Sequence, residues 1–259
     1  MQPFYFGSSK KQLFGIYHAP DVEPAKSTGV VLCHPLGHEY LRAHRAFRNL
    51  AVSLAGLGFH VLRFDYYGAG DSSGEAEDVT IGQCLTDLGT AIDELKDTAG
   101  VSSVSLIGVR FGATLAALAA ARRRDVDRLV LWDPEQDGRG YIEQLATLQR
   151  NWLVDRLGGV PPSLGAGELI GFALTDTVRA ELEAITLVPF PRVQAKAVFV
   201  MTSEARPSYD ALLKEIESAH RSVTRIGVDE PCDWDRGDMV HQILLPHAMV
   251  RSITGVMSA

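Results

Sequence analysis

Paired cysteines, long apolar runs and an excess of positive charge are all missing from this sequence. Its three cysteines, Cys33, Cys84 and Cys232, lie far apart and form no Cys-x-x-Cys pair, so neither a disulfide framework nor a zinc cage is indicated. The formal net charge is −7 and the pI is about 5.6, so we expect no nucleic-acid partner. We expect neither a metal nor a cofactor.

No stretch of the chain approaches the ~20 consecutive apolar residues of a membrane-spanning helix. The first residues, Met1 to Gly7, lack the basic segment followed by an apolar segment that marks a secretory leader. We therefore expect no membrane span and a cytoplasmic location.

Short apolar strands alternate with helical patterns along most of the chain. An antiparallel hairpin is expected at residues 3–6 and 12–18, where polar and apolar residues alternate around a Gly-Ser-Ser-Lys-Lys turn. Further strands are expected at residues 29–33, 60–65, 103–108, 129–132, 197–202 and 223–228, with helices between them. This alternation predicts an α/β fold with a mostly parallel sheet, whose ligand crevice lies beyond the carboxyl ends of the strands.

Residues 134–190 interrupt the alternation. They carry one helical stripe (Tyr141, Leu145, Leu148 and Trp152) and a second helix around 178–185, but no good strand. We predict a helical lid at 134–190, inserted into a single core domain built from 1–133 and 191–259. A chain of 259 residues, 46% of them hydrophobic, suits one such domain better than two small ones.

Residues 104–113 have the layout of a nucleophile elbow, in which a strand runs into a sharp turn and then a helix. Gly108 and Gly112 keep such a turn free of clashes, but Arg110 stands where the Gly-x-Ser-x-Gly pattern has its serine. Arginine stays protonated at any accessible pH, so Arg110 can be neither a nucleophile nor a general base. It can only bind or stabilise negative charge.

Two interpretations of Arg110 stay open. In the first, Arg110 and the start of its helix hold an anionic substrate group or the oxyanion that develops during acyl transfer. In the second, Arg110 forms a salt bridge with Glu39 or Asp133 and fills a dead pocket, because buried arginine is usually paired.

The segment 61–74, Val-Leu-Arg-Phe-Asp-Tyr-Tyr-Gly-Ala-Gly-Asp-Ser-Ser-Gly, resembles the strand-4 signature of serine-aminopeptidase-type hydrolases. The resemblance extends to the α/β-hydrolase fold over nearly the whole chain. Within it, the sequence is most similar to the hydrolases associated with the exosortase A system. The features that carry this likeness are His34-Pro35 with Glu39 and Arg45, the Gly-x-Arg-x-Gly elbow, and Leu131-Trp132-x-Pro134 followed by Gly140-Tyr141.

The resemblance also implies site residues, with departures. The backbone N–H groups of Leu36 and Phe111 would form the oxyanion hole by position. Family members place an acid after strand 7 and a Gly-x-Gly-His after strand 8. Here Glu204 is the nearest substitute for that acid, and residues 229–234 contain no histidine. The candidate catalytic residues are Arg110, His241, Asp133 and Glu204, and the candidate substrate-binding residues are His34, His38, Glu39 and Tyr141.

Several of these candidates have further interpretations. His38 and Glu39 are placed to face the pocket, and a solvated loop explains them equally well. For the base, His247 inside the first turn of the last helix is an alternative to His241. Asp133 follows a strand at a place that some members use for their acid, although a helix cap for the lid explains it as well. His34 is expected to order its loop rather than to do chemistry.

Two functions are compatible with these features. The first is a hydrolase-like enzyme acting on an ester, thioester or amide with an anionic portion, in which loop-activated water replaces the serine. The second is a non-catalytic pseudo-hydrolase that binds an acidic ligand or an acyl-carrier partner. The substrate would be a small molecule or an acyl-carrier-bound group. We lean towards the enzyme, and the sequence leaves open whether the protein is a homodimer.

Overall fold

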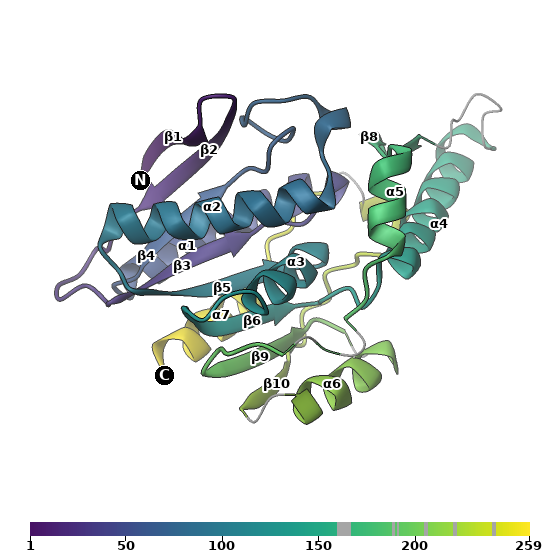
Figure 1. Ribbon diagram of the computed structural model, residues 1–259. Helices are drawn as coiled ribbons and strands as arrows, with labels where there is room; N and C mark the ends of the chain where they lie inside the picture. Colours follow the sequence, from purple (N-terminus) through teal and green to yellow (C-terminus); the bar gives the residue numbers. More distant parts are fainter. Residues whose placement is uncertain (160–166, 188–189, 191, 205–206, 220–221, 240–241) are drawn as a thin grey trace.

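A central sheet of eight strands forms the body of the molecule (Figure 1). The computed structural model describes all residues except 160–166, 188–189, 191, 205–206, 220–221 and 240–241. The strands are β1 (Gln2–Ser8), β2 (Lys11–His18), β3 (Thr28–Cys33), β4 (His60–Phe64), β5 (Ser103–Val109), β6 (Val126–Trp132), β9 (Ala197–Thr202) and β10 (Val223–Gly227). They lie side by side in the order β1-β2-β4-β3-β5-β6-β9-β10.

The pairing of the strands confirms the predicted architecture. From β4 to β10 every neighbouring pair runs parallel, whereas β1 and β2 form an antiparallel hairpin whose second strand pairs antiparallel with β4. The expected N-terminal hairpin and the mostly parallel sheet are therefore both present. Because parallel strands end at the same edge, the loops after β3, β5, β6, β9 and β10 meet at one end of the molecule.

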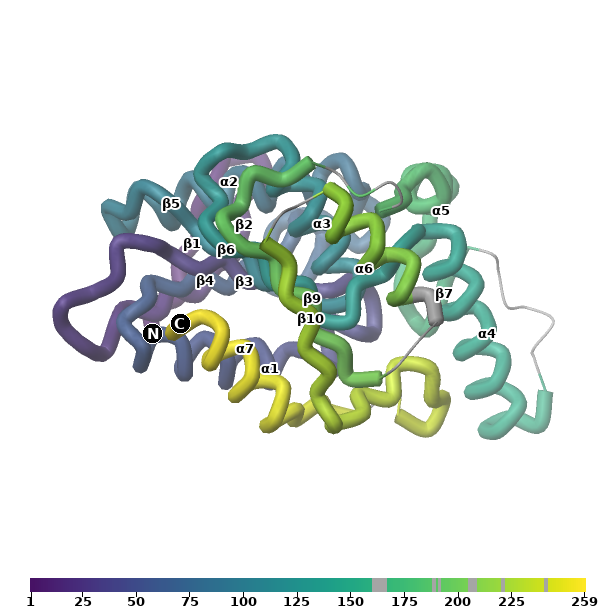
Figure 2. Tube along the Cα trace, turned by 90° about the horizontal axis from the view of Figure 1, so that it is seen from below, coloured from purple at the N-terminus to yellow at the C-terminus, as the bar shows by residue number. Residues whose placement is uncertain are grey.

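Helices cover both faces of the sheet. On one face lie α2 (Ile81–Ala99), α3 (Phe111–Ala120) and α6 (Pro207–Ala219), which share one hydrophobic core with the sheet. On the other face α1 (Gly37–Gly56) and α7 (His247–Ser258) run side by side over a second core (Figure 2). Helix α3 is buried along nearly its whole length, as its apolar sequence predicts.

A compact insertion separates β6 from β9. It contains α4 (Gly138–Leu157), β7 (Glu168–Leu169), β8 (Phe172–Ala173) and α5 (Asp176–Glu183), and it lies at one end of the sheet (Figure 1). The expectation of no strand here was wrong, since β7 and β8 pair as a small hairpin. Each of these strands has only two residues, too few to show an alternating pattern. The signal was Gly171, which with Ile170 has the positive φ of a tight turn.

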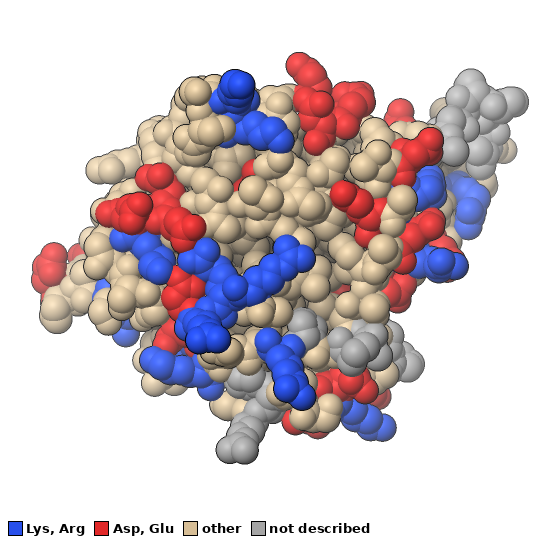
Figure 3. All heavy atoms as spheres, viewed as in Figure 1, with Lys and Arg blue, Asp and Glu red and all other residues tan. Residues whose placement is uncertain are grey.

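Two single turns of 3₁₀ helix, η1 (Ala76–Asp78) and η2 (Gly237–Met239), complete the described elements. None of the described helices combines the length and the apolar composition that crossing a membrane requires. Acidic and basic side chains both occur on the face of the molecule that carries α2 and α3 (Figure 3).

Candidate functional site

Arg110 lies at the apex of the turn between β5 and α3. Its φ and ψ are 54° and −128°, a backbone conformation that residues other than glycine rarely adopt. The Arg110 N–H donates to the Trp132 carbonyl at 2.9 Å, which ties the turn to the end of β6. A Cβ on Gly112 would lie 2.4 Å from the carbonyl oxygens of Cys33 and His34, so the turn packs directly on the end of β3. The strained geometry expected for an elbow is therefore present.

The Arg110 side chain is completely buried and already paired. Its Nε donates to Glu39 Oε1 at 2.8 Å, and its Nη2 donates to Gln144 Oε1 at 2.8 Å. A second ion pair joins Nη1 to Glu135. Burial by itself opposes the positive charge, but Glu39 and Glu135 hold the pKa of Arg110 well above its ordinary value. Of the two partners that the salt-bridge interpretation named, Glu39 pairs with Arg110, whereas the second ion pair is made by Glu135 and not by Asp133.

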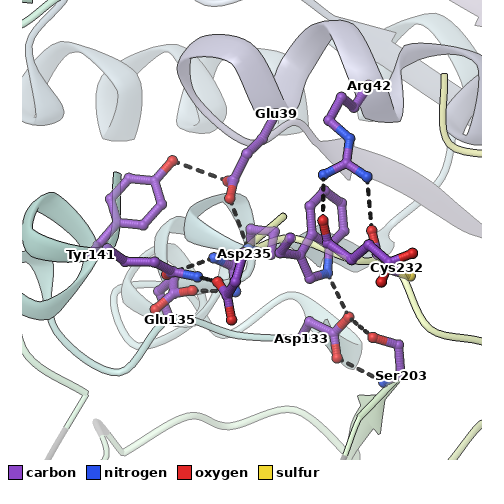
Figure 4. Close-up of polar contacts among 12 residues, drawn as sticks. Glu39, Arg42, Asp133, Glu135, Tyr141, Ser203, Cys232 and Asp235 are labelled. Carbon is purple, nitrogen blue, oxygen red and sulfur yellow. Dashed lines mark hydrogen bonds and ion pairs between the residues drawn. The ribbon is translucent and has the colours of Figure 1, made fainter. Parts of the chain in front are cut away.

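Glu39 extends this network to the insertion. It comes from the first turn of α1 and accepts a hydrogen bond from the Tyr141 hydroxyl at 3.0 Å (Figure 4). The Tyr141 ring stacks on Phe111, with 5.2 Å between centroids and 23° between planes. Burial, and after it the charge of Glu39, raises the pKa of Tyr141 well above its ordinary value, so the hydroxyl stays a donor. Core, elbow and insertion are thus joined through one buried carboxylate.

The carboxylate of Asp133, just after β6, is held by hydrogen bonds from Ser203 and Trp234. It accepts from Ser203 N at 2.8 Å, from Ser203 Oγ at 2.6 Å and from Trp234 Nε1 at 2.8 Å (Figure 4). The alternative that Asp133 caps the lid helix is wrong, because Asp137 is the residue that caps α4, accepting from Gly140 N at 2.7 Å. The carboxylate of Asp133 instead joins the ends of β6 and β9 to the loop after β10.

Trp234 is one of the site residues that sequence reasoning missed. It belongs to the loop after β10, where the resemblance expects a histidine, and it is almost fully buried. Its ring centroid lies 5.3 Å from the guanidinium carbon of Arg110 and 5.0 Å from that of Arg42, so the ring contacts two buried cations. An indole N–H only donates and does not titrate, so Trp234 cannot act as a base. The absence of a histidine from 229–234 was the available signal.

A cavity of about 330 Å³ opens beside this network, between the core and the insertion. The core contributes the loop after β3, the start of α1 and the loop after β4, and the insertion contributes α4, β7, β8 and α5. Arg110 does not line the cavity. The lining of the cavity includes Leu36, His38, Tyr40, Tyr141 and Leu145.

This fold and site can be compared with known proteins. Residues 25–199, more than half of the chain, match the family model described as serine aminopeptidase, S33. The chain belongs to that family. No curated protein matches the sequence at a significant level.

Several solved structures have the same fold as this S33-family chain. Est1E from Butyrivibrio proteoclasticus, solved with ferulic acid, superposes with a TM-score of 0.67 at 21% identity, covering 99% of this chain and 100% of that chain. Alpha/beta hydrolase domain-containing protein 10 from mouse gives a TM-score of 0.63 at 17% identity, with 99% and 97% covered. A proline iminopeptidase from Mycobacterium smegmatis gives 0.65 at 14% identity, with 99% and 96% covered. The fold is therefore the α/β-hydrolase fold.

The structure separates the candidate residues of this S33-family chain into groups. Contacts link Arg110 to Glu39, Glu39 to Tyr141 and Tyr141 to Phe111. Leu36, His38 and Tyr141 line the cavity. Glu204 is half-buried beside Ser203, after β9. His241 lies outside the described residues. Its part in catalysis and the likeness to exosortase-associated hydrolases both stay predictions.

His34 lies at the end of β3, packed against α1 and not in the cavity lining. Its ring centroid is 4.5 Å from that of Phe47 and 5.0 Å from that of Tyr40. Nδ1 has no hydrogen-bond partner among the described residues. Burial, with smaller contributions from Arg63 and His44, holds the pKa of His34 well below its ordinary value. His34 therefore stays neutral in the folded protein at neutral pH.

The low pKa of His34 predicts a loss of stability in acid. Below the ordinary histidine pKa of about 6.5 the unfolded chain takes up a proton that folded His34 does not, so stability falls as pH falls. The expected contribution is up to about 1.4 kcal/mol per pH unit. Urea unfolding at pH 7.0 and pH 5.5 should show a shallower pH dependence for His34→Phe than for the wild type. Equal slopes would contradict the assignment.

Proposed function

We propose that this S33-family protein is a non-catalytic relative of the α/β-hydrolases that binds a small molecule in the cavity between core and insertion. The observation that carries the proposal is the state of Arg110. It occupies the apex of the elbow, it is completely buried, and it is ion-paired with Glu39 and Glu135. A serine hydrolase needs at this apex a hydroxyl that a neighbouring base can deprotonate, and a guanidinium supplies neither function.

The surroundings of the elbow support the same proposal. A triad needs a histidine between the nucleophile and an acid. Here the ring between Arg110 and Asp133 is the indole of Trp234, which contacts both. Asp133 accepts three hydrogen bonds from Ser203 and Trp234, so its acceptor capacity is largely used. The three positions are in contact, but their side chains are suited to packing and pairing.

A second candidate function is hydrolysis of an ester, thioester or amide by activated water. Two backbone positions favour it. Leu36, in the loop after β3, lines the cavity, and Phe111 is the first residue of α3. Two backbone N–H donors at such positions stabilise an oxyanion in acyl transfer. For this second function, His38, which also lines the cavity, is the candidate base that activates the water.

Turnover distinguishes the two candidates. A panel of acyl esters and thioesters with neutral and anionic ends should give no hydrolysis above the buffer rate with the wild type. Hydrolysis by the wild type that is lost in His38→Ala, which removes the base, would favour the enzyme instead. Circular dichroism should show that the variant keeps its fold. A fluorophosphonate probe should not label this protein, although it labels a serine hydrolase used as the positive control. Labelling of this protein would show that it carries a reactive serine and would contradict the description of the elbow.

A further inference from the structure

The walls of the cavity carry no formal charge among the described residues. Within the part of the chain that the structure describes, the lining contains no aspartate, glutamate, lysine or arginine, and His38 is its single histidine. Most of the remaining surface is supplied by leucine, valine, alanine, phenylalanine and tyrosine. A volume of about 330 Å³ is within the range of small-molecule sites. The lining is therefore suited to apolar groups.

The two buried cations that contact Trp234 are not available to a ligand, and a third buried arginine, Arg63, does not line the cavity. Arg110 is held by Glu39, Glu135 and Gln144. Arg42 donates to the carbonyl oxygens of Cys232 at 2.8 Å and Asp233 at 3.1 Å, and it stacks on Trp234. A carboxylate in the cavity would therefore lose its water without gaining a counter-ion, which costs several kcal/mol.

The charges behind the cavity wall also disfavour an anion. The ion-paired set next to Tyr141 contains one cation, Arg110, and two carboxylates, Glu39 and Glu135. Arg42 and Asp133, which both contact Trp234, add one charge of each sign. The net charge of these groups is negative. Two hydroxyls of the lining are also committed as donors, because Tyr141 donates to Glu39 at 3.0 Å and Tyr40 donates to Asp65 Oδ1 at 2.8 Å. Their oxygens can still accept, which favours a ligand that is neutral or a donor.

We infer that the cavity selects a neutral apolar ligand and discriminates against the carboxylate of the same shape. The inference rests on the proposed binding function and specifies its ligand class. It replaces the anionic ligand that the sequence suggests for Arg110, because the guanidinium does not line the cavity and is already ion-paired with Glu39 and Glu135. The preference for the neutral ligand then comes from the free-energy cost of desolvating a charged one and not from a direct contact.

Methyl octanoate and octanoate, titrated by calorimetry at pH 8, test this inference. The ester should bind at least tenfold more tightly than the carboxylate. Leu145→Trp, on the cavity face of α4, should weaken the ester at least tenfold by filling the cavity. Leu157→Trp is the matched control, since Leu157 is on the same helix and 64% exposed, and it should leave binding unchanged.

The outcomes separate the two proposals. Equal or tighter binding of octanoate, or ester binding unaffected by Leu145→Trp, would overturn the neutral-ligand inference alone. If the ester instead takes up water and releases methanol and octanoate, the non-catalytic function is wrong while the ligand class stands. No binding of either compound up to its solubility limit would overturn both.

Discussion

Replacement of Arg110 by methionine is expected to lower the free energy of unfolding by about 3–5 kcal/mol. The side chain is fully buried, and its removal leaves Glu39 without a cation in a site that is equally buried. Methionine keeps most of the length of the side chain and its contact with Trp234, so the loss reports the charge and not a cavity. Chemical unfolding in urea measures it.

Two further variants isolate the cause. Arg110→Met combined with Glu39→Gln should recover much of the loss, because glutamine is neutral and still accepts from the Tyr141 hydroxyl. Arg123→Met removes an arginine that pairs with Asp93 and Asp125 nearer the surface, and it should cost less than about 1 kcal/mol. If Arg110→Met costs no more than Arg123→Met, the buried network does not hold the elbow together.

The second large effect is expected from Gly112→Ala. A Cβ at this position would lie 2.4 Å from the carbonyl oxygens of Cys33 and His34 and 2.7 Å from the carbonyl carbon of His34. These atoms are main chain at the end of a central strand, so no side-chain movement relieves the overlap. We expect a loss of about 4 kcal/mol or more, or a chain that does not fold, measured by thermal and urea unfolding.

Gly89→Ala is the matched control for Gly112→Ala. Gly89 lies within α2, and a Cβ there would meet no atom within 4 Å. The substitution should stabilise the protein by about 0.5–1 kcal/mol, because alanine loses less backbone freedom than glycine when a helix forms. Similar effects of the two substitutions would contradict the close packing of α3 on the end of β3.

Much of the fold could be predicted from local patterns. The strand at 197–202 was located to the residue as β9, and the stripe through Tyr141 and Leu145 located α4. Both signals arise because burial of one face repeats with the geometry of the element itself. The hairpin β7–β8 was missed since strands of two residues carry no period.

The candidate site was less accessible to sequence reasoning. Glu39 could be named as a partner of Arg110 because buried arginine needs a carboxylate, and few were close to the elbow in the expected fold. Trp234 and Gln144 could not be named, since they reach Arg110 from the loop after β10 and from the insertion. No spacing along the chain relates these segments to the elbow.

The sequence by itself determined the order of strands and helices, the glycine-flanked turn and the presence of an arginine at its apex. Those features depend on residues that are neighbours in the chain. Only the tertiary structure decided that Arg110 is paired inside the protein, that Trp234 contacts both Arg110 and Asp133, and that the described residues lining the adjacent cavity carry no formal charge. These outcomes depend on which side chains five separate loops bring together at one end of the sheet, and burial then requires each charge to find its partner there.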